Sequence, residues 1–131
     1  MAMCDGIRES RSESGVFHLK GIRQRLIAPG FPFVPARLWC FLVLTNPESG
    51  EFPCYIRVVN DRTDRTVFYG YLKPRPSFGV GGGTFPCHAP IRCAFSKAGT
   101  YTIPVWFFQM DRKDVLKGEM TFSIVAAGEQ P

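Results

Sequence analysis

The chain has 131 residues and a mass of 14.7 kDa, which is enough for one domain with a single hydrophobic core. Hydrophobic residues make up 45% and charged residues 21%, a composition that excludes disorder along most of the length. No apolar run approaches the roughly 20 residues of a membrane-spanning helix. The formal net charge of +5 permits an anionic partner but does not identify one.

The first residues lack the basic region and apolar run of a secretory signal, so we expect a cytoplasmic protein. The five cysteines follow the spacing of no disulfide framework and of no paired Cys-x-x-Cys zinc motif. We therefore expect reduced thiols, with Cys40 and Cys54 acting as small buried hydrophobic residues.

Residues 8–15 are polar and Ser-rich, and they predict a mobile segment. After it, short apolar or alternating runs predict strands at 16–22, 37–45, 54–60, 66–72, 91–95, 100–110 and 115–125. A Pro-rich connection at 28–35 and a Gly-rich connection at 73–84 separate some of these strands. No stretch of ten residues has a clean helical period.

Seven to eight short strands separated by Gly, Pro, Asn and Asp turns are typical of one architecture. The sequence therefore predicts an all-β, antiparallel, immunoglobulin-like β-sandwich that occupies residues 1–131 as a single domain.

Four short motifs carry a resemblance that spans most of the chain. They are residues 17–22 (FHLKGI), 28–32 (APGFP), the strand that begins at Arg37, and residues 98–101 (AGTY). In these motifs the sequence resembles a family of small bacterial proteins of unknown function. The resemblance implies an immunoglobulin-like sandwich and transfers no catalytic residue.

Two of the predicted strands are apolar on both faces, whereas a two-layer sandwich leaves one face of each sheet in water. If these strands are neighbours, their second faces form an exposed patch that marks a partner surface, most simply that of a homodimer. The predicted interaction face comprises Trp39, Phe41, Val43, Trp106 and Phe108. The alternative hypothesis is that this face is covered, either by the Pro-rich connection or by the Gly-rich loop with Phe78 and Phe85.

A second hypothesis rests on the densest basic cluster, because Arg binds phosphate and carboxylate groups in a bidentate manner. The candidates for an anionic ligand are Lys20, Arg23, Arg25 and Arg37. Nucleic acid is the less favoured anion, since acidic residues interrupt the second half of the chain and no RNA-binding motif is present.

Two turns carry paired carboxylates, Asp61 with Asp64 and Asp111 with Asp114, as in calcium-binding loops. Arg and Lys residues lie between the members of each pair and would repel a cation, and Asp is favoured in turns for its own hydrogen bonding. We therefore expect no metal at these turns.

Cys87, His88 and Cys93 could also suggest a metal, but no fourth ligand is near in sequence, so we expect neither metal nor cofactor. His88 is expected in a solvated loop and His18 on a surface strand. With two histidines and no base placed beside a nucleophile, an enzyme is the third hypothesis, after a protein-interaction or self-association module and an anion-binding module.

Overall fold

The computed structural model describes residues 1–109 and 113–128. Across these residues the chain forms twelve strands, which confirms the all-β prediction. The six longer strands are β5 (Trp39–Asn46), β7 (Cys54–Asn60), β8 (Arg65–Tyr71), β10 (Gly83–Pro90), β11 (Gly99–Phe107) and β12 (Val115–Ala126). The six shorter strands are β1 (Ala2–Cys4), β2 (Gly6–Glu9), β3 (Phe17–Lys20), β4 (Arg25–Ala28), β6 (Gly50–Glu51) and β9 (Ser77–Phe78). No helix capable of crossing a membrane occurs in the described part.

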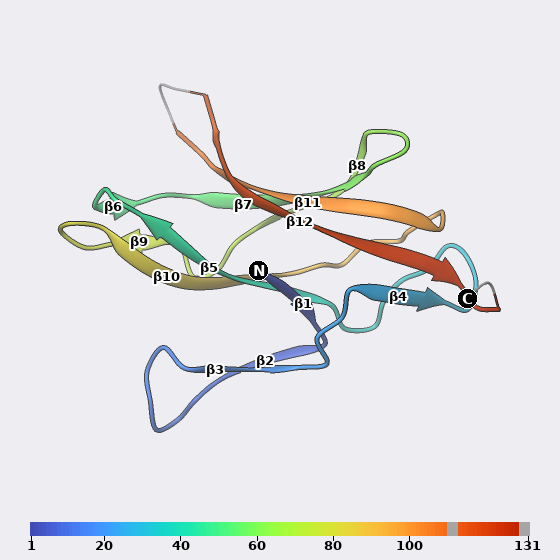
Figure 1. The fold of residues 1–131 in the computed structure, drawn as a ribbon, viewed down its shortest axis with the longest axis horizontal. Helices are drawn as coiled ribbons and strands as arrows, with labels where there is room; N and C mark the ends of the chain where they lie inside the picture. The colour runs from blue at the N-terminus through green and yellow to red at the C-terminus, as the bar shows by residue number, and fades with distance from the viewer. Residues whose placement is uncertain (110–112, 129–131) are drawn as a thin grey trace.

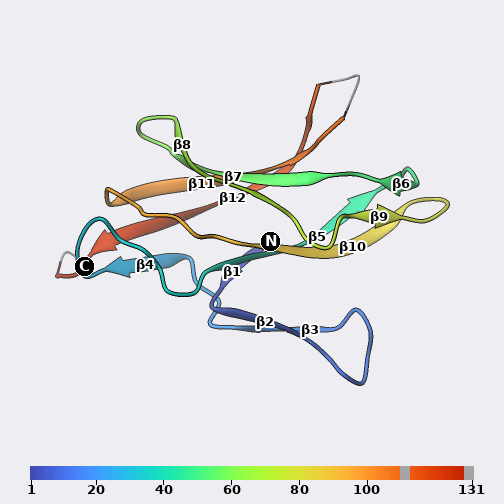
Figure 2. The same ribbon diagram turned by 180° about the vertical axis from the view of Figure 1, so that it is seen from behind.

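Two sheets lie face to face, as Figure 1 shows, and the core fills the space between them. One has the strand order β1-β5-β10 and the other the order β4-β12-β11-β7-β8. All pairings are antiparallel except that of β4 with β12, which is parallel. The hairpin of β2 and β3 forms a further layer outside the three-stranded sheet, and the views in Figures 1 and 2 agree on this.

The hairpin is closed at its base by an ion pair. Arg23 donates from Nε to Asp5 Oδ1 at 2.7 Å and from Nη2 to Asp5 Oδ2 at 2.8 Å. The turn that brings the two residues together passes through Gly21, whose φ of +64° is left-handed and therefore suits glycine. The predicted mobile segment 8–15 is the outer part of this hairpin. It is partly strand, and the amide of Ser10 donates to the carbonyl of Val16 at 2.7 Å.

The strand at 54–60 is confirmed with its bounds, whereas the strand predicted at 91–95 is wrong. The strand lies instead at 83–90 and includes Pro86 and Pro90, which disfavour a strand in the interior of a sheet. Among the strands β10 pairs only with β5, so it is the edge of its sheet, and a single bridge between His88 and Lys73 lies on its other side. An edge strand tolerates proline because one side of it needs no N–H donor.

Alternate residues of the strands fill the core, as their apolar periodicity predicts. Tyr101 is among the largest buried side chains, and its ring packs edge-on against Phe95 at 5.1 Å between centroids. Its hydroxyl donates to the carbonyl of Lys97 at 2.7 Å, which satisfies the one polar atom that this side chain brings into the core.

Candidate interaction surfaces

The structure divides the predicted interaction face between two sheets. Trp39, Phe41 and Val43 belong to β5 of the three-stranded sheet, whereas Trp106 lies on β11 of the five-stranded sheet and Phe108 follows it. The outer faces of the two sheets point in opposite directions (Figure 1). The five residues therefore do not form one patch, because the condition that the two strands are neighbours is not met.

The β2–β3 hairpin covers part of the β5 side. Phe17 of the hairpin packs on Phe41 with 5.2 Å between ring centroids, and both Trp39 and Phe41 are half-buried. Val43, farther along β5, remains 53% exposed. The cover is not the one proposed from the sequence, since Phe78 is itself buried in the core and Phe85 packs against it.

The outer side of the five-stranded sheet carries aromatic residues, some of which are exposed to solvent. Register places Tyr55 directly opposite both Trp106 and Tyr71, and Trp106 directly opposite Leu116, so these side chains point to the same side. We call this surface the aromatic face and define it as Tyr55, Tyr69, Tyr71, Trp106, Phe108 and Leu116. The sequence reasoning missed Tyr69 and Tyr71, although their alternation in the run VFYGY is the signal that could have found them.

The aromatic face is both exposed and ordered by contacts between its rings. Tyr71 is 61% exposed, Tyr69 53%, Leu116 46% and Phe108 45%. Tyr55 is buried, and its ring stacks against that of Tyr69 with 4.9 Å between centroids. Its hydroxyl donates to the carboxylate of Asp114, and burial, followed by this hydrogen bond, raises the pKa of Tyr55 above its ordinary value.

Charged side chains border the aromatic face along a groove of about 460 Å³. The guanidinium of Arg57 lies over the ring of Trp106, 5.3 Å from its centroid, in a cation–π contact. Within the described residues, Arg57 Nε and Trp106 Nε1 are buried without a hydrogen-bond acceptor. The carboxylates of the groove come from Asp61, Asp64 and Glu119.

Three of the four predicted anion-binding residues line a single cavity. Lys20, Arg23 and Arg37 surround a space of about 500 Å³ at the base of the hairpin. Arg25 is exposed on β4 and does not line this cavity. The hydrogen bonds from Arg23 hold the pKa of Asp5, the carboxylate in the same cavity, below its ordinary value.

Comparison with known proteins gives no relative. No family model, curated protein or solved structure matches the chain.

The cysteines are free thiols in packing positions. Cys40 and Cys54 are buried in the core, as predicted. Cys87 is buried on β10 rather than at the end of a loop, and burial raises its pKa to about 12. Cys93 is partly exposed outside any strand, with a pKa raised by burial to about 11. Thiols with raised pKa values are poor nucleophiles at neutral pH.

His18 is exposed on β3, as predicted, whereas the prediction of a solvated loop for His88 is wrong. His88 lies on β10 with its ring edge-on to Trp39 at 5.5 Å, and burial lowers its pKa. Its Nδ1 is buried without a partner in the described part of the chain.

The described residues hold no group of three His, Cys, Asp or Glu side chains placed to bind a metal. Asp61 and Asp64 lie in the turn between β7 and β8, where Asp61 accepts a hydrogen bond from Thr102 at 2.6 Å. Of the other predicted pair, Asp111 lies outside the described residues, and Asp114 accepts from Tyr55.

Proposed function

We propose that this chain is a non-enzymatic protein-interaction module that self-associates through its aromatic face. The observation that carries the proposal is the exposure of four large apolar side chains, from Tyr69 to Leu116, on the same outer face of a single sheet. Tyr, Trp and Phe are enriched in protein interfaces because they bury a large area with few rotatable bonds. Contiguous exposed apolar surface of this kind marks a partner site.

The charges beside the aromatic face suit a second copy of the same chain. In a two-fold symmetric dimer the same patch meets itself, so a surface with both signs of charge can be complementary to itself. Here Arg57 lies beside the carboxylates of Asp64 and Glu119 in one groove. Arg57 of one copy would therefore face carboxylates of the other.

We propose that the fold is immunoglobulin-like. The orders β1-β5-β10 and β12-β11-β7-β8 correspond to strands A, B, E and to strands G, F, C, C′ of a variable-type domain, and this correspondence supports the proposal. The hydrogen bond from Tyr101, at the start of β11, to Lys97 has the position of the tyrosine corner near the start of strand F. Membership of the small bacterial family remains a prediction.

We propose a cytoplasmic location. Its support is the set of five free cysteines, which suits a reducing compartment.

Sedimentation equilibrium across a range of protein concentrations tests self-association. The wild type is expected to form a dimer, and Tyr71→Ser and Phe108→Ser are each expected to weaken the dimer at least tenfold, as loss of an interface aromatic does. Val43→Ser is the matched control, because Val43 is similarly exposed on the other sheet. A wild type that is monomeric at millimolar concentration would overturn the proposal.

A further inference from the structure

The cavity at the base of the β2–β3 hairpin is lined by three successive parts of the chain. Asp5, Gly6, Lys20 and Arg23 come from the base of the hairpin, and Leu26 and Ile27 from β4. Residues 33 and 35 belong to the Pro-rich connection, and residues 36 and 37 follow it. None of these residues belongs to the aromatic face. A second cavity of about 390 Å³ adjoins the first, since Arg37 and four further residues line both.

The charge of the first cavity is positive and largely uncompensated. Lys20, Arg23 and Arg37 provide three cations against the single carboxylate of Asp5, a net charge of +2. Asp5 is already engaged by two hydrogen bonds from Arg23. In the described part of the chain neither Lys20 nor Arg37 forms an ion pair. Two cations are thus available to an anionic group.

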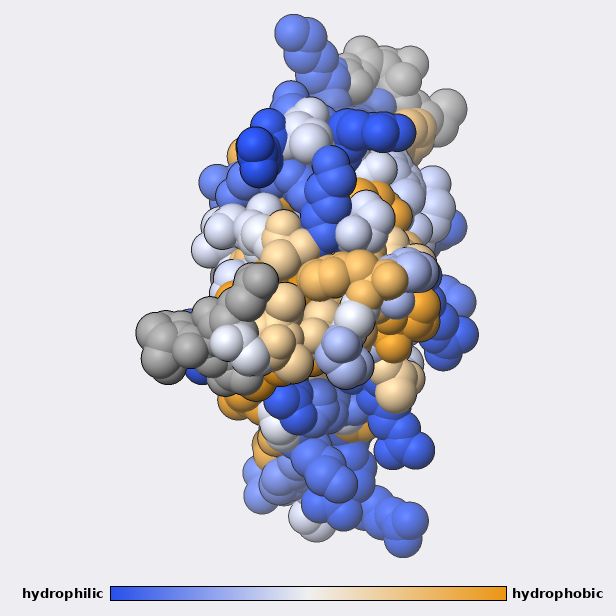
Figure 3. Space-filling view, turned by 90° about the vertical axis from the view of Figure 1, so that its right-hand side faces the viewer, coloured by the Kyte–Doolittle hydropathy of each residue, from blue (hydrophilic) through white to orange (hydrophobic). Residues whose placement is uncertain are grey.

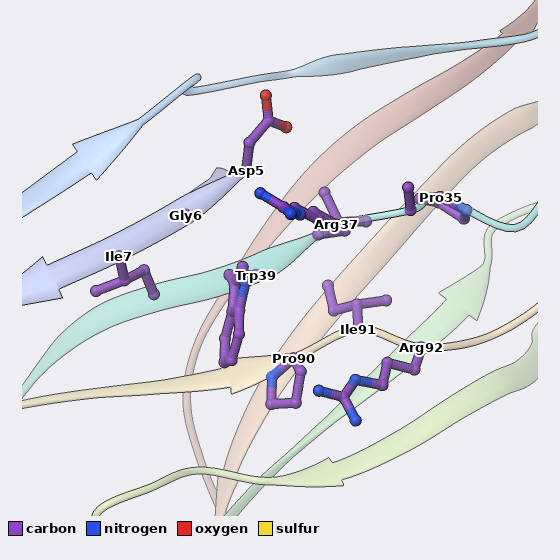
Figure 4. A pocket seen from close by; sticks show the side chains of 11 residues that line it. Asp5, Gly6, Ile7, Pro35, Arg37, Trp39, Pro90, Ile91 and Arg92 are labelled. Carbon is purple, nitrogen blue, oxygen red and sulfur yellow. The ribbon is translucent and has the colours of Figure 1, made fainter.

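Figure 4 shows how the adjoining cavity continues this charge. The guanidinium of Arg37 lies on the Asp5 side of Trp39, and Arg92 lies on the side of Pro90. Arg37 is the cation that both cavities share.

The remaining wall of the first cavity is apolar. Leu26, Ile27, Phe33 and Pro35 line it. Leu26 is buried in the core, whereas Ile27 is 46% exposed and Phe33 is half-buried. Figure 3 views the end of the molecule to which β4 and the Pro-rich connection extend, and shows apolar surface bordered by hydrophilic side chains. Val34, 62% exposed, belongs to the same connection. A simple inorganic anion would leave this apolar wall in water.

We propose that this cavity binds a soluble monoacyl carboxylate, with the carboxylate held by Arg37 and Lys20 and the acyl chain against Ile27, Phe33 and Pro35. A guanidinium pairs with a carboxylate through two parallel hydrogen bonds. Binding of the acyl chain releases its apolar surface, and that of the cavity wall, from water.

Isothermal titration with decanoate, below its micelle concentration, tests the proposal. Decanoate is expected to bind about 15-fold more tightly than octanoate, because each buried methylene group contributes about fourfold. Decanol and acetate are expected to bind at least tenfold more weakly than decanoate, the first for lack of charge and the second for lack of a chain. Equal affinity for acetate and decanoate would overturn the proposal.

Two variants locate the carboxylate. Arg37→Met keeps an unbranched side chain close in length to the aliphatic part of arginine and removes the charge, and it is expected to weaken decanoate binding at least tenfold. Arg25→Met is the matched control and is expected to leave the affinity unchanged, because Arg25 does not line the cavity. Equal losses in the two variants would contradict the site.

If Arg37→Met fails to fold, Lys20→Met at the exposed end of β3 provides the same test. Co-sedimentation with anionic phospholipid vesicles, without any binding of monomeric decanoate, would overturn the proposal in favour of a membrane surface.

Discussion

Gly21→Ala perturbs the turn that closes the base of the hairpin. The backbone at Gly21 has a φ of +64°, and an L residue in this left-handed conformation costs about 1–2 kcal/mol. An added Cβ would also overlap the carboxylate of Asp5, since it would lie 2.8 Å from Cγ. Asp5 must therefore turn away from Arg23, and the backbone cost is a lower limit for the loss in the free energy of unfolding.

Thermal unfolding followed by circular dichroism measures this loss. A loss of about 1–2 kcal/mol lowers the Tm of a domain of this size by roughly 3–10 °C. Gly30→Ala is the matched control, because no atom lies within 4 Å of its added Cβ and its φ is not left-handed. It is expected to change the Tm little.

The same variant links the hairpin base to the proposed carboxylate site. Because displacement of Asp5 frees Arg23 as a further cation in the cavity, Gly21→Ala is also expected to strengthen decanoate binding, whereas Gly30→Ala is not. Asp5→Ala removes most of the overlap and should reduce the cost of Gly21→Ala toward that of the backbone alone. A Gly21→Ala protein with the Tm of the Gly30→Ala protein would refute the reasoning.

Three further predictions concern the core and its titratable groups. Tyr101→Phe leaves the Lys97 carbonyl without its donor and should cost about 1 kcal/mol in chemical denaturation, whereas Tyr71→Phe, at an exposed ring, should cost nothing measurable. Burial lowers the pKa of His88, so the unfolded chain binds more protons just below pH 6.5 and stability should fall as pH decreases through that range. His88→Gln should remove this part of the pH dependence, and an unchanged profile would contradict it. Alkylation of the folded protein at pH 8 should be slow and should begin at Cys93, the one thiol that is not buried. Cys93→Ser should abolish this first phase of labelling. Rapid labelling of several thiols would contradict the burial of the other four cysteines.

The extent of the β7 strand could be read from the sequence because its alternating run lies between Pro53 and the polar turn that begins at Asp61. The strand at 83–90 could not, since Gly83, Pro86 and Pro90 oppose strand formation locally. Only its position at the edge of a sheet, which is a tertiary property, makes these residues acceptable. The short strands β1 and β4 are likewise stabilised by the sheets that they join rather than by their own sequence.

The candidate sites also depend on tertiary contacts that the local sequence does not reveal. Alternation identified Trp106 and Phe108 as residues on a second apolar face, but it could not show that β5 belongs to the opposite sheet. Tyr71 joins the aromatic face through strand pairing with Tyr55, which periodicity does not reveal. Lys20 and Arg37 are separated by the whole of β4 and the Pro-rich connection, so only the folded chain shows that they line one cavity.

Self-association through the aromatic face is the central claim, and backbone amide chemical shifts recorded during dilution test it most directly. Dilution from millimolar to micromolar concentration is expected to shift the amides of residues 55–57, 69–71 and 104–108, and to leave those of residues 41–45 on β5 unchanged. Shifts confined to β5 and β10, or spectra identical at all concentrations, would contradict the claim.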